Sequence, residues 1–219
     1  MLVQIYEVQS PEEAAALARL GVDHIGVLVG DGAFPRELPA ARVRAIFAAV
    51  PSERKRVALS LSARLGEVRR VIEQTRPDII HIGAAMELFS TDDARVLRAE
   101  FPSVLIMRAI PIVDDASIEW AKAYEGIADF LLLDSHDPGD RQIGALGRTH
   151  DWNISRRIVD EVKLPAILAG GLDAQNVAAA IAAVRPAGVD SKTKTDRSDG
   201  AGKDLEKVRE FVAAAKITT

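Results

Sequence analysis

The chain of 219 residues contains no cysteine. Disulfide bridges, zinc sites built on cysteine and catalysis by a thiol are therefore excluded. Aromatic residues make up only 5% of the sequence, and the formal net charge is −4. Composition and charge thus give no reason to expect a partner that is a nucleic acid or an anionic membrane. No apolar run reaches the roughly 18 residues that a membrane-spanning helix needs.

The first residues, Met-Leu-Val-Gln-Ile-Tyr-Glu, have neither the basic start nor the apolar stretch of a secretory signal. We therefore expect a cytoplasmic protein. Hydrophobic residues account for 48% of the chain, which is enough for a sizeable core, and no low-complexity linker divides it. We expect residues 1–219 to form a single domain.

Eight apolar segments alternate with eight segments of helical pattern. The expected strands are Val3–Tyr6, His24–Val29, Arg56–Leu61, Ile79–Gly83, Val104–Ile110, Asp129–Ser135, Pro165–Gly171 and Gly188–Ser191. They are continuous Val/Ile/Leu runs, as expected when helices cover a parallel sheet. Eight such units predict an α/β fold, a single (β/α)8 TIM barrel. The alternative is a doubly wound open sheet, but no Gly-x-Gly-x-x-Gly motif follows the first strand.

In TIM barrels the chemistry lies at the carboxyl ends of the strands and in the loops that follow them. Asp134 ends the apolar strand that begins at Phe130, and a long polar loop runs from it to Trp152. A connection of roughly 17 residues is too long for a plain linker, so we expect it to cover a ligand. Asp151 should cap the helix that follows.

A glycine pair follows the seventh expected strand, in Ala169-Gly170-Gly171-Leu172. Glycines allow the backbone to approach an oxyanion, and the start of the next helix would add N–H donors. Phosphate sites after strands seven and eight recur in this fold. We therefore predict a phosphate site here; a tight turn without a ligand is the alternative.

These motifs resemble, in order and spacing, the phosphoribosylanthranilate isomerase family of tryptophan biosynthesis. The resemblance rests on Leu131–Ser135, Gly144-x-x-Gly147-Arg148, Asp151-Trp152, Leu168–Leu172, Asn176-Val177, Gly188-Val-Asp190, and Ser10-Pro11-Glu12 with Pro35-Arg36. It implies an aldose–ketose (Amadori-type) isomerase for a phosphorylated sugar derivative, with Asp134 as general acid. It further implies substrate contacts from Arg36, Arg148 and Asp190, and phosphate contacts from Ala169, Gly170, Gly171, Leu172, Lys192, Thr193 and Lys194.

The sequence departs from this family at the catalytic positions. Tyr6-Glu7 stands where the family has its basic cysteine and a glycine, and His81-Ile-Gly-Ala replaces Gln-Leu-His-Gly. Tyr6, Glu7 and His81 are therefore the candidates for the catalytic base. A phenol could match a thiol only if its pKa were lowered by roughly 1.5 units. Packing of the Tyr6 ring against the ligand is the alternative.

The loop after the eighth strand departs too, because Lys192-Thr-Lys194-Thr-Asp196 replaces Ser-Ser-Gly-Val-Glu. If the strand continues, Lys192 and Lys194 lie on one face and could bind an anionic group; solvated loop charges are the alternative. A lysine in place of a left-handed glycine also predicts a changed loop shape.

Three other functions stay open: a divergent paralogue acting on another phosphosugar, a metal-dependent epimerase or lyase, and a non-catalytic barrel that binds a phosphometabolite. His81, Asp134 and His136 could hold a divalent ion, but their spacing matches no metal motif. We therefore predict no metal and no cofactor. The expected partner is a small phosphorylated substrate, with no nucleic acid and no membrane, and the protein is expected to be a monomer or a homodimer.

Overall fold

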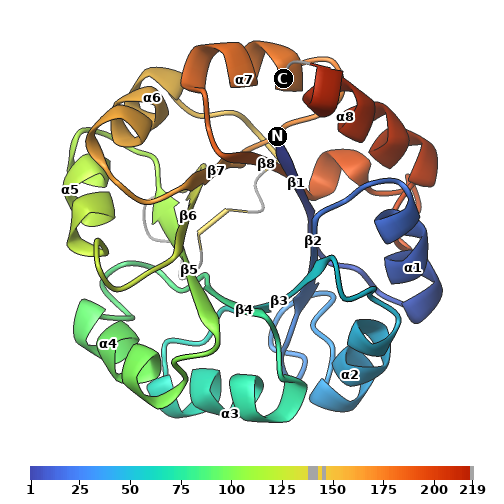
Figure 1. The fold of residues 1–219 in the computed structure, drawn as a ribbon, viewed down its shortest axis with the longest axis horizontal. Coiled ribbons are helices and arrows are strands. Elements are labelled where there is room, and N and C mark those ends of the chain that lie inside the picture. Colours follow the sequence, from blue (N-terminus) through green and yellow to red (C-terminus); the bar gives the residue numbers. More distant parts are fainter. Residues whose placement is uncertain (138–142, 145–146, 218–219) are drawn as a thin grey trace.

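The computed structural model describes residues 1–137, 143–144 and 147–217. Its parallel strands close into a barrel in sequence order, with β1 paired to β8, and the helices form a ring around them (Figure 1). The strands are β1 (Leu2–Ile5), β2 (His24–Leu28), β3 (Lys55–Ser60), β4 (Ile79–Ile82), β5 (Leu105–Pro111), β6 (Phe130–Asp134), β7 (Ala166–Leu168) and β8 (Gly188–Ser191). The predicted (β/α)8 barrel is confirmed.

The helices are α1 (Pro11–Arg19), α2 (Ala40–Ala48), α3 (Leu65–Thr75), α4 (Thr91–Glu100), α5 (Ala116–Ala123), α6 (Trp152–Glu161), α7 (Val177–Val184) and α8 (Leu205–Ile217). A short 3-10 turn, η1 (Thr193–Thr195), follows β8. Within the part of the chain that the structure describes, no helix combines the length and apolarity required to cross a membrane.

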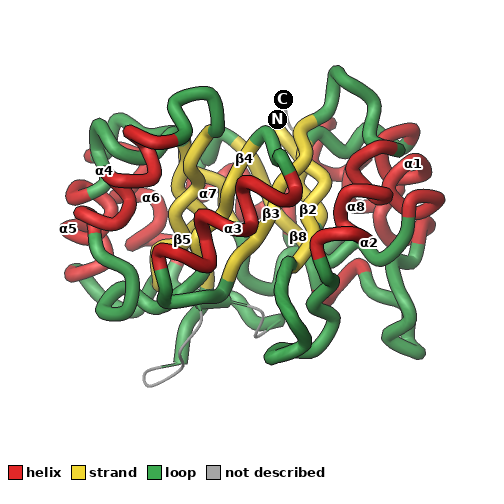
Figure 2. Tube along the Cα trace, turned by 90° about the horizontal axis from the view of Figure 1, so that it is seen from below, coloured by secondary structure: helices red, strands yellow, loops and turns green. Residues whose placement is uncertain are grey.

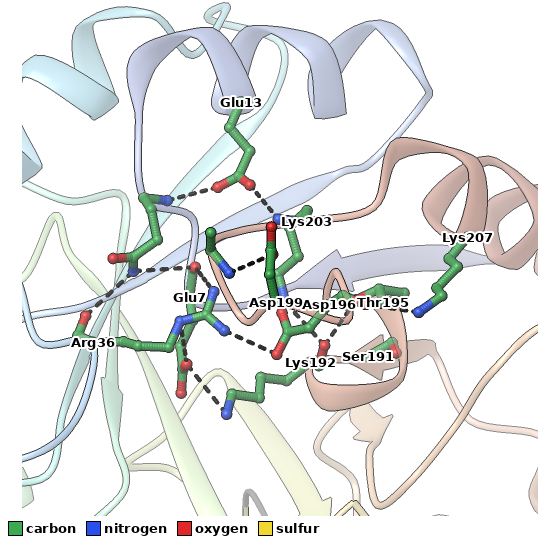
Figure 3. Close-up of polar contacts among 12 residues, drawn as sticks. Glu7, Glu13, Arg36, Ser191, Lys192, Thr195, Asp196, Asp199, Lys203 and Lys207 are labelled. Atoms are coloured by element: carbon green, nitrogen blue, oxygen red, sulfur yellow. Dashed lines mark hydrogen bonds and ion pairs between the residues drawn. The ribbon is translucent and has the colours of Figure 1, made fainter.

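Ser10 caps helix α1, but the sequence Ser10-Pro11-Glu12-Glu13 does not form a complete capping box. The Ser10 hydroxyl accepts a hydrogen bond from the N–H of Glu13 at 3.2 Å. The Glu13 carboxylate does not return to Ser10; it accepts the N–H of Gln9 at 2.7 Å and that of Lys203. Glu13 therefore ties α1 to the segment that precedes α8 (Figure 3).

The β7–α7 connection differs from the prediction at both ends. β7 stops at Leu168 because Gly170 and Gly171 turn the backbone into the left-handed region, with φ of 88° and 64°. α7 starts only at Val177, and not directly after the glycine pair, because the Asp173 carboxylate accepts the N–H groups of Gln175 and Asn176 in a turn. The helix thus begins several residues beyond the glycine pair.

The inside of the barrel is filled by a layer of side chains that lies below the carboxyl ends of the strands. Its buried members are Tyr6, Val57, Ile79, Met107, Leu132, Ile167 and Ala169. A larger apolar core separates the strands from the helices. The filled interior provides a rigid floor on which a site at the strand ends can be built.

Arg108 on β5 belongs to the outer core and not to the site. Its guanidinium is fully buried and donates to the carbonyl groups of Ile82 and Ala84, each at 2.8 Å, and to the Tyr124 hydroxyl at 3.0 Å. It faces away from the barrel interior because successive side chains of a strand alternate, and its neighbour Met107 points inward.

Candidate active site

A cavity of about 260 Å³ lies at the carboxyl ends of the strands. This face carries the long loops, at the end of the barrel away from the N-terminus (Figure 2). The cavity is lined by Tyr6, Glu7, Leu28, Phe34, Pro35, Leu59, Leu61, His81, Leu132, Asp134, Ile143, Asp190 and Lys192. A smaller pocket shares Asp134, Asp190 and Lys192 with it and extends to Gly170, Gly171, Leu172, Thr193 and Lys194.

Asp134 ends β6 and is held by the loop that follows. Its Oδ1 accepts the backbone N–H of Ser135 at 2.7 Å. Gly144 packs directly against the carboxylate: a Cβ at Gly144 would lie 2.1 Å from Asp134 Oδ2, and its φ is 88°. Only glycine fits this contact without strain. The predicted ligand cover can be followed only in part, because residues 138–142 and 145–146 lie outside the described residues.

Asp190 on β8 faces the same two cavities as Asp134. It is 5% exposed, and its Oδ1 has no hydrogen-bond partner among the described residues. Burial, and then the negative charge of Asp134, raise the pKa of Asp190 to about 8. Asp190 therefore keeps its proton at neutral pH beside the carboxyl group of Asp134, and paired carboxyl groups with such a shift are typical of acid–base sites.

Tyr6 and His81 form a buried pair on the cavity floor, with 2.6 Å between Tyr6 Oη and His81 Nδ1. Burial, and then the charge of Asp190, raise the pKa of Tyr6 well above its ordinary value. Burial, and then the charge of Arg108, lower the pKa of His81 to about 3. Both side chains are therefore neutral at pH 7, and the condition that the sequence sets for Tyr6 as a base is not met.

In this neutral pair neither ring nitrogen of His81 is free to accept a proton from a substrate. The phenol donates to Nδ1, because the alternative acceptor, Met107 Sδ, is weaker and 3.8 Å away. His81 Nε2 then carries the hydrogen, and it has no partner among the described residues. The Tyr6 ring fits because its neighbour on β2 is Gly26, where a Cβ would lie 2.3 Å from Tyr6 Cδ1.

Five charged side chains meet beside the cavity and form what we call the Glu7 cluster: Glu7, Arg36, Lys192, Asp196 and Lys203 (Figure 3). Glu7 Oε2 lies 3.2 Å from Arg36 Nε and 3.2 Å from Lys192 Nζ. Asp196 binds Arg36 Nη1 at 2.9 Å and Lys203 Nζ at 2.6 Å. The predicted substrate anchor Arg36 is thus already engaged by two carboxylates.

The smaller pocket contains most of the predicted phosphate residues, with two differences. Ala169 belongs to the buried interior layer and does not line the pocket. Lys192 and Lys194 do not share a strand face, because the strand does not continue: β8 ends at Ser191 and the chain turns into η1. Lys194 sits in this right-handed turn, so the loop has the changed shape that the sequence predicts.

The helix expected to point its N-terminus at a phosphate does not begin there, since α7 starts only at Val177. The pocket wall instead consists of the left-handed Gly170 and Gly171 on one side and the start of η1 on the other. A Cβ at Gly171 would lie 2.9 Å from the Arg148 backbone, so this glycine permits a close approach of the two loops.

Arg148 itself is not brought into the site. Its side chain is 56% exposed and pairs with Asp137, and it lines neither cavity. Asp151 does cap α6, as predicted, by accepting the Asn153 N–H at 2.9 Å. Across the described ranges no group of three or more His, Asp or Glu side chains could hold a metal ion.

Sequence reasoning missed two features of the site. Leu28, Leu59 and Leu61 give the cavity an apolar wall that no motif marks. The ion pair between Glu7 and Lys192 was also missed, although a signal existed: both residues depart from the family pattern, their charges are opposite, and β1 pairs with β8.

Comparisons with known proteins agree with this geometry. The family model described as N-(5'phosphoribosyl)anthranilate (PRA) isomerase matches residues 3–214. The N-(5'-phosphoribosyl)anthranilate isomerase of Methanocella arvoryzae is 36% identical over 99% of this chain and 98% of its own length.

Solved structures with the same name share the fold. The enzyme from Pyrococcus furiosus has a TM-score of 0.80 at 26% identity, with 99% of each chain covered. Another, in complex with reduced 1-(o-carboxyphenylamino)-1-deoxyribulose 5-phosphate, has a TM-score of 0.81 at 21% identity, with 99% of this chain and 98% of that chain covered. This chain therefore belongs to the phosphoribosylanthranilate isomerase family.

Proposed function

We propose that this protein catalyses the Amadori-type rearrangement of an N-(5-phosphoribosyl)amine to the corresponding 1-amino-1-deoxyribulose 5-phosphate. The observation that carries the proposal is the pair of carboxyl groups, Asp134 and Asp190, which lines both the main cavity and the glycine-walled pocket beside it. The reaction needs one proton donor and one proton acceptor near the sugar. A carboxyl pair that holds a single proton supplies both.

Proton transfers in this scheme balance without an outside reagent. Asp134 gives the shared proton to the ring oxygen while the bond from C1 to that oxygen breaks, which leaves an iminium group at C1. A carboxylate of the pair then removes the proton from C2 and forms an enaminol. A proton returns to C1 as the C2 hydroxyl loses its own, which gives the ketone and restores the pair to its single proton.

The smaller pocket is the proposed phosphate site. Gly170 and Gly171 let the backbone approach closely, and Thr193 opens the 3-10 turn on the facing wall. Lys192 lines both cavities and lies between the phosphate and the sugar in this scheme. Backbone walls of this kind, with a nearby ammonium group, suit a phosphate dianion.

Tyr6 and His81 form the floor beneath the sugar in this proposal rather than the base. Tyr6→Phe should therefore lower kcat/KM by no more than about tenfold, because removal of a true general base usually costs a hundredfold or more. Steady-state kinetics of wild type, Tyr6→Phe and Tyr6→Cys measure this directly. A loss above a hundredfold in Tyr6→Phe, with unchanged melting temperature, would assign the proton transfer to Tyr6.

The test of the function itself is turnover. Purified protein is incubated in D2O with N-(5-phosphoribosyl)anthranilate or with its aniline analogue, and the product is followed by NMR. We expect ketone formation, with deuterium at C1 to the extent that the carboxyl pair exchanges the proton taken from C2 with the solvent before a proton returns to C1. Cytoplasmic location and a monomeric or homodimeric state remain predictions from the sequence.

A further inference from the structure

The Glu7 cluster contains three cations and two carboxylates. Within the part of the chain that the structure describes, its cations form ion pairs only inside the cluster: Arg36 with Glu7 and Asp196, Lys192 with Glu7, and Lys203 with Asp196. The cluster therefore keeps one positive charge in excess. Lys192 presents this charge to a ligand, because it lines both the main cavity and the smaller pocket, whereas Arg36 and Lys203 line neither.

The position of the Lys192 ammonium group depends on Glu7. The backbone of Lys192 is fixed, since its carbonyl group accepts the Thr195 hydroxyl and Lys203 Nζ, each at 2.9 Å. Its side chain is 24% exposed, and Glu7 Oε2, 3.2 Å from Nζ, is its one ionic partner among the described residues. An ammonium group has three N–H donors, so donors remain for a ligand.

Glu7 itself is held firmly. Arg36 Nε lies 3.2 Å from its carboxylate, and Arg36 Nη2 donates to its carbonyl group at 3.1 Å. Gln9 Nε2 donates to the same carbonyl group at 3.2 Å. The backbone of Glu7 is left-handed, with φ of 60°, and strain that is retained beside a site points to function. The Glu7 carboxylate is thus a fixed partner for the flexible Lys192 side chain.

The smaller pocket offers an anion a backbone wall but needs a cation. Gly170, Gly171 and Thr193 line it together with Lys192 and Lys194. Lys194 is exposed on η1, and no described residue forms an ion pair with it. Lys192 is the lysine that a buried carboxylate holds in place. A side chain that is already ordered loses less conformational entropy when a ligand binds.

We propose that Glu7 is a positioning residue that holds the Lys192 ammonium group at the junction of the two cavities, where this group binds the phosphate of the substrate. Arg36 supports this arrangement by fixing Glu7. The excess positive charge of the cluster remains available to the phosphate, because the charge of Glu7 is shared between Arg36 and Lys192. This inference rests on the proposed function for the phosphoribosyl part of the substrate.

The test measures binding by calorimetry with three ligands. The first is reduced 1-(o-carboxyphenylamino)-1-deoxyribulose 5-phosphate, the second lacks its phosphate, and the third lacks its carboxylate. The proteins are wild type, Lys192→Met, Glu7→Gln, Glu7→Asp and the double variant Glu7→Gln/Lys192→Met. Glu12→Gln and Lys163→Met are the matched controls, because both residues are exposed and outside the cluster. Melting temperatures show whether each variant is folded.

Lys192→Met should weaken binding of the phosphorylated ligands by about thirtyfold, since a hydrogen bond between charged groups is lost. Glu7→Gln should weaken it by about tenfold, and so should Glu7→Asp, which keeps the charge but ends one methylene short of Lys192. The double variant should be no weaker than Lys192→Met, because Glu7 acts through Lys192. The ligand without phosphate should bind all the proteins equally, and the controls should match wild type.

Several results would overturn the inference. Tighter binding by Glu7→Gln would mean that Glu7 only neutralises Lys192. Additive losses in the double variant would mean that Glu7 acts independently of Lys192. Losses that depend on the carboxylate of the ligand and not on its phosphate would place Lys192 at the other end of the substrate.

Turnover separates this inference from the proposed function. Ketone formation by wild type, with Glu7→Gln binding the phosphorylated ligands as wild type does, would keep the isomerase function and overturn the inference. The expected pattern of binding in a protein that forms no ketone would support the inference and remove the isomerase function.

Discussion

Asp134→Asn should lower kcat/KM by about a thousandfold and leave the fold intact. Loss of a general acid usually costs a hundredfold to ten-thousandfold. An asparagine has no proton to give to the ring oxygen, yet its Oδ1 can still accept the Ser135 N–H that positions residue 134. The side chain keeps its size, so the close contact with Gly144 is also kept. Steady-state kinetics of the purified variant measure the loss of activity, and thermal unfolding of the same preparation shows whether the fold is intact.

Asp114→Asn is the matched control for this experiment. Asp114 is an exposed aspartate on the loop after β5, and its Oδ1 accepts the Ala116 N–H as asparagine also could. The control should retain wild-type kinetics. If Asp134→Asn kept activity within tenfold of wild type, Asp134 would have no part in the proton transfers.

Asp190→Asn should remove the pH dependence of activity and of stability that arises from titration of Asp190 in the wild type. The pair needs its proton, so wild-type activity should fall as pH rises through about 8, the raised pKa of Asp190. An unfolded aspartate has a pKa near 3.9, so the folded protein binds more protons than the unfolded one between about pH 4 and 8. The stability that the neutral carboxyl contributes is therefore present below pH 4 and lost as pH rises through about 8.

Asparagine resembles the neutral carboxyl and cannot ionise. At pH 9 the free energy of unfolding of Asp190→Asn should exceed that of wild type by an amount on the order of a few kcal/mol. The difference in free energy of unfolding should shrink toward pH 4. The activity of the variant should be lower than that of wild type at every pH. Denaturant titrations from pH 4 to 9 measure the difference. A constant difference across this range would mean that Asp190 titrates normally and that the pair does not share a proton.

The architecture could be predicted from the sequence because it depends on local patterns. Apolar runs and turn residues locate the strands to within a few residues, and the expected strand Gly188–Ser191 matches β8 at both ends. Asp134 could be found for the same reason, since a carboxylate after an apolar strand must lie at the end of the barrel that carries the chemistry.

The electrostatics of the site could not be predicted, because they depend on contacts between strands far apart in the chain. The pKa of Tyr6 is raised by burial and by Asp190, which is 184 positions away in the sequence. Whether the cations beside Tyr6 lower its pKa depends on their partners, and Arg36 and Lys192 are both paired with Glu7. Glu7 also has a left-handed backbone, which its residue type does not suggest.

The most direct test of the central claim is the NMR assay in D2O with both phosphoribosyl amines, wild type beside Asp134→Asn. The account predicts that wild type forms the ketone from at least one of the two compounds and that Asp134→Asn forms none above background. Absence of ketone with either compound in folded wild type would contradict the claim that this barrel is an isomerase of phosphoribosyl amines.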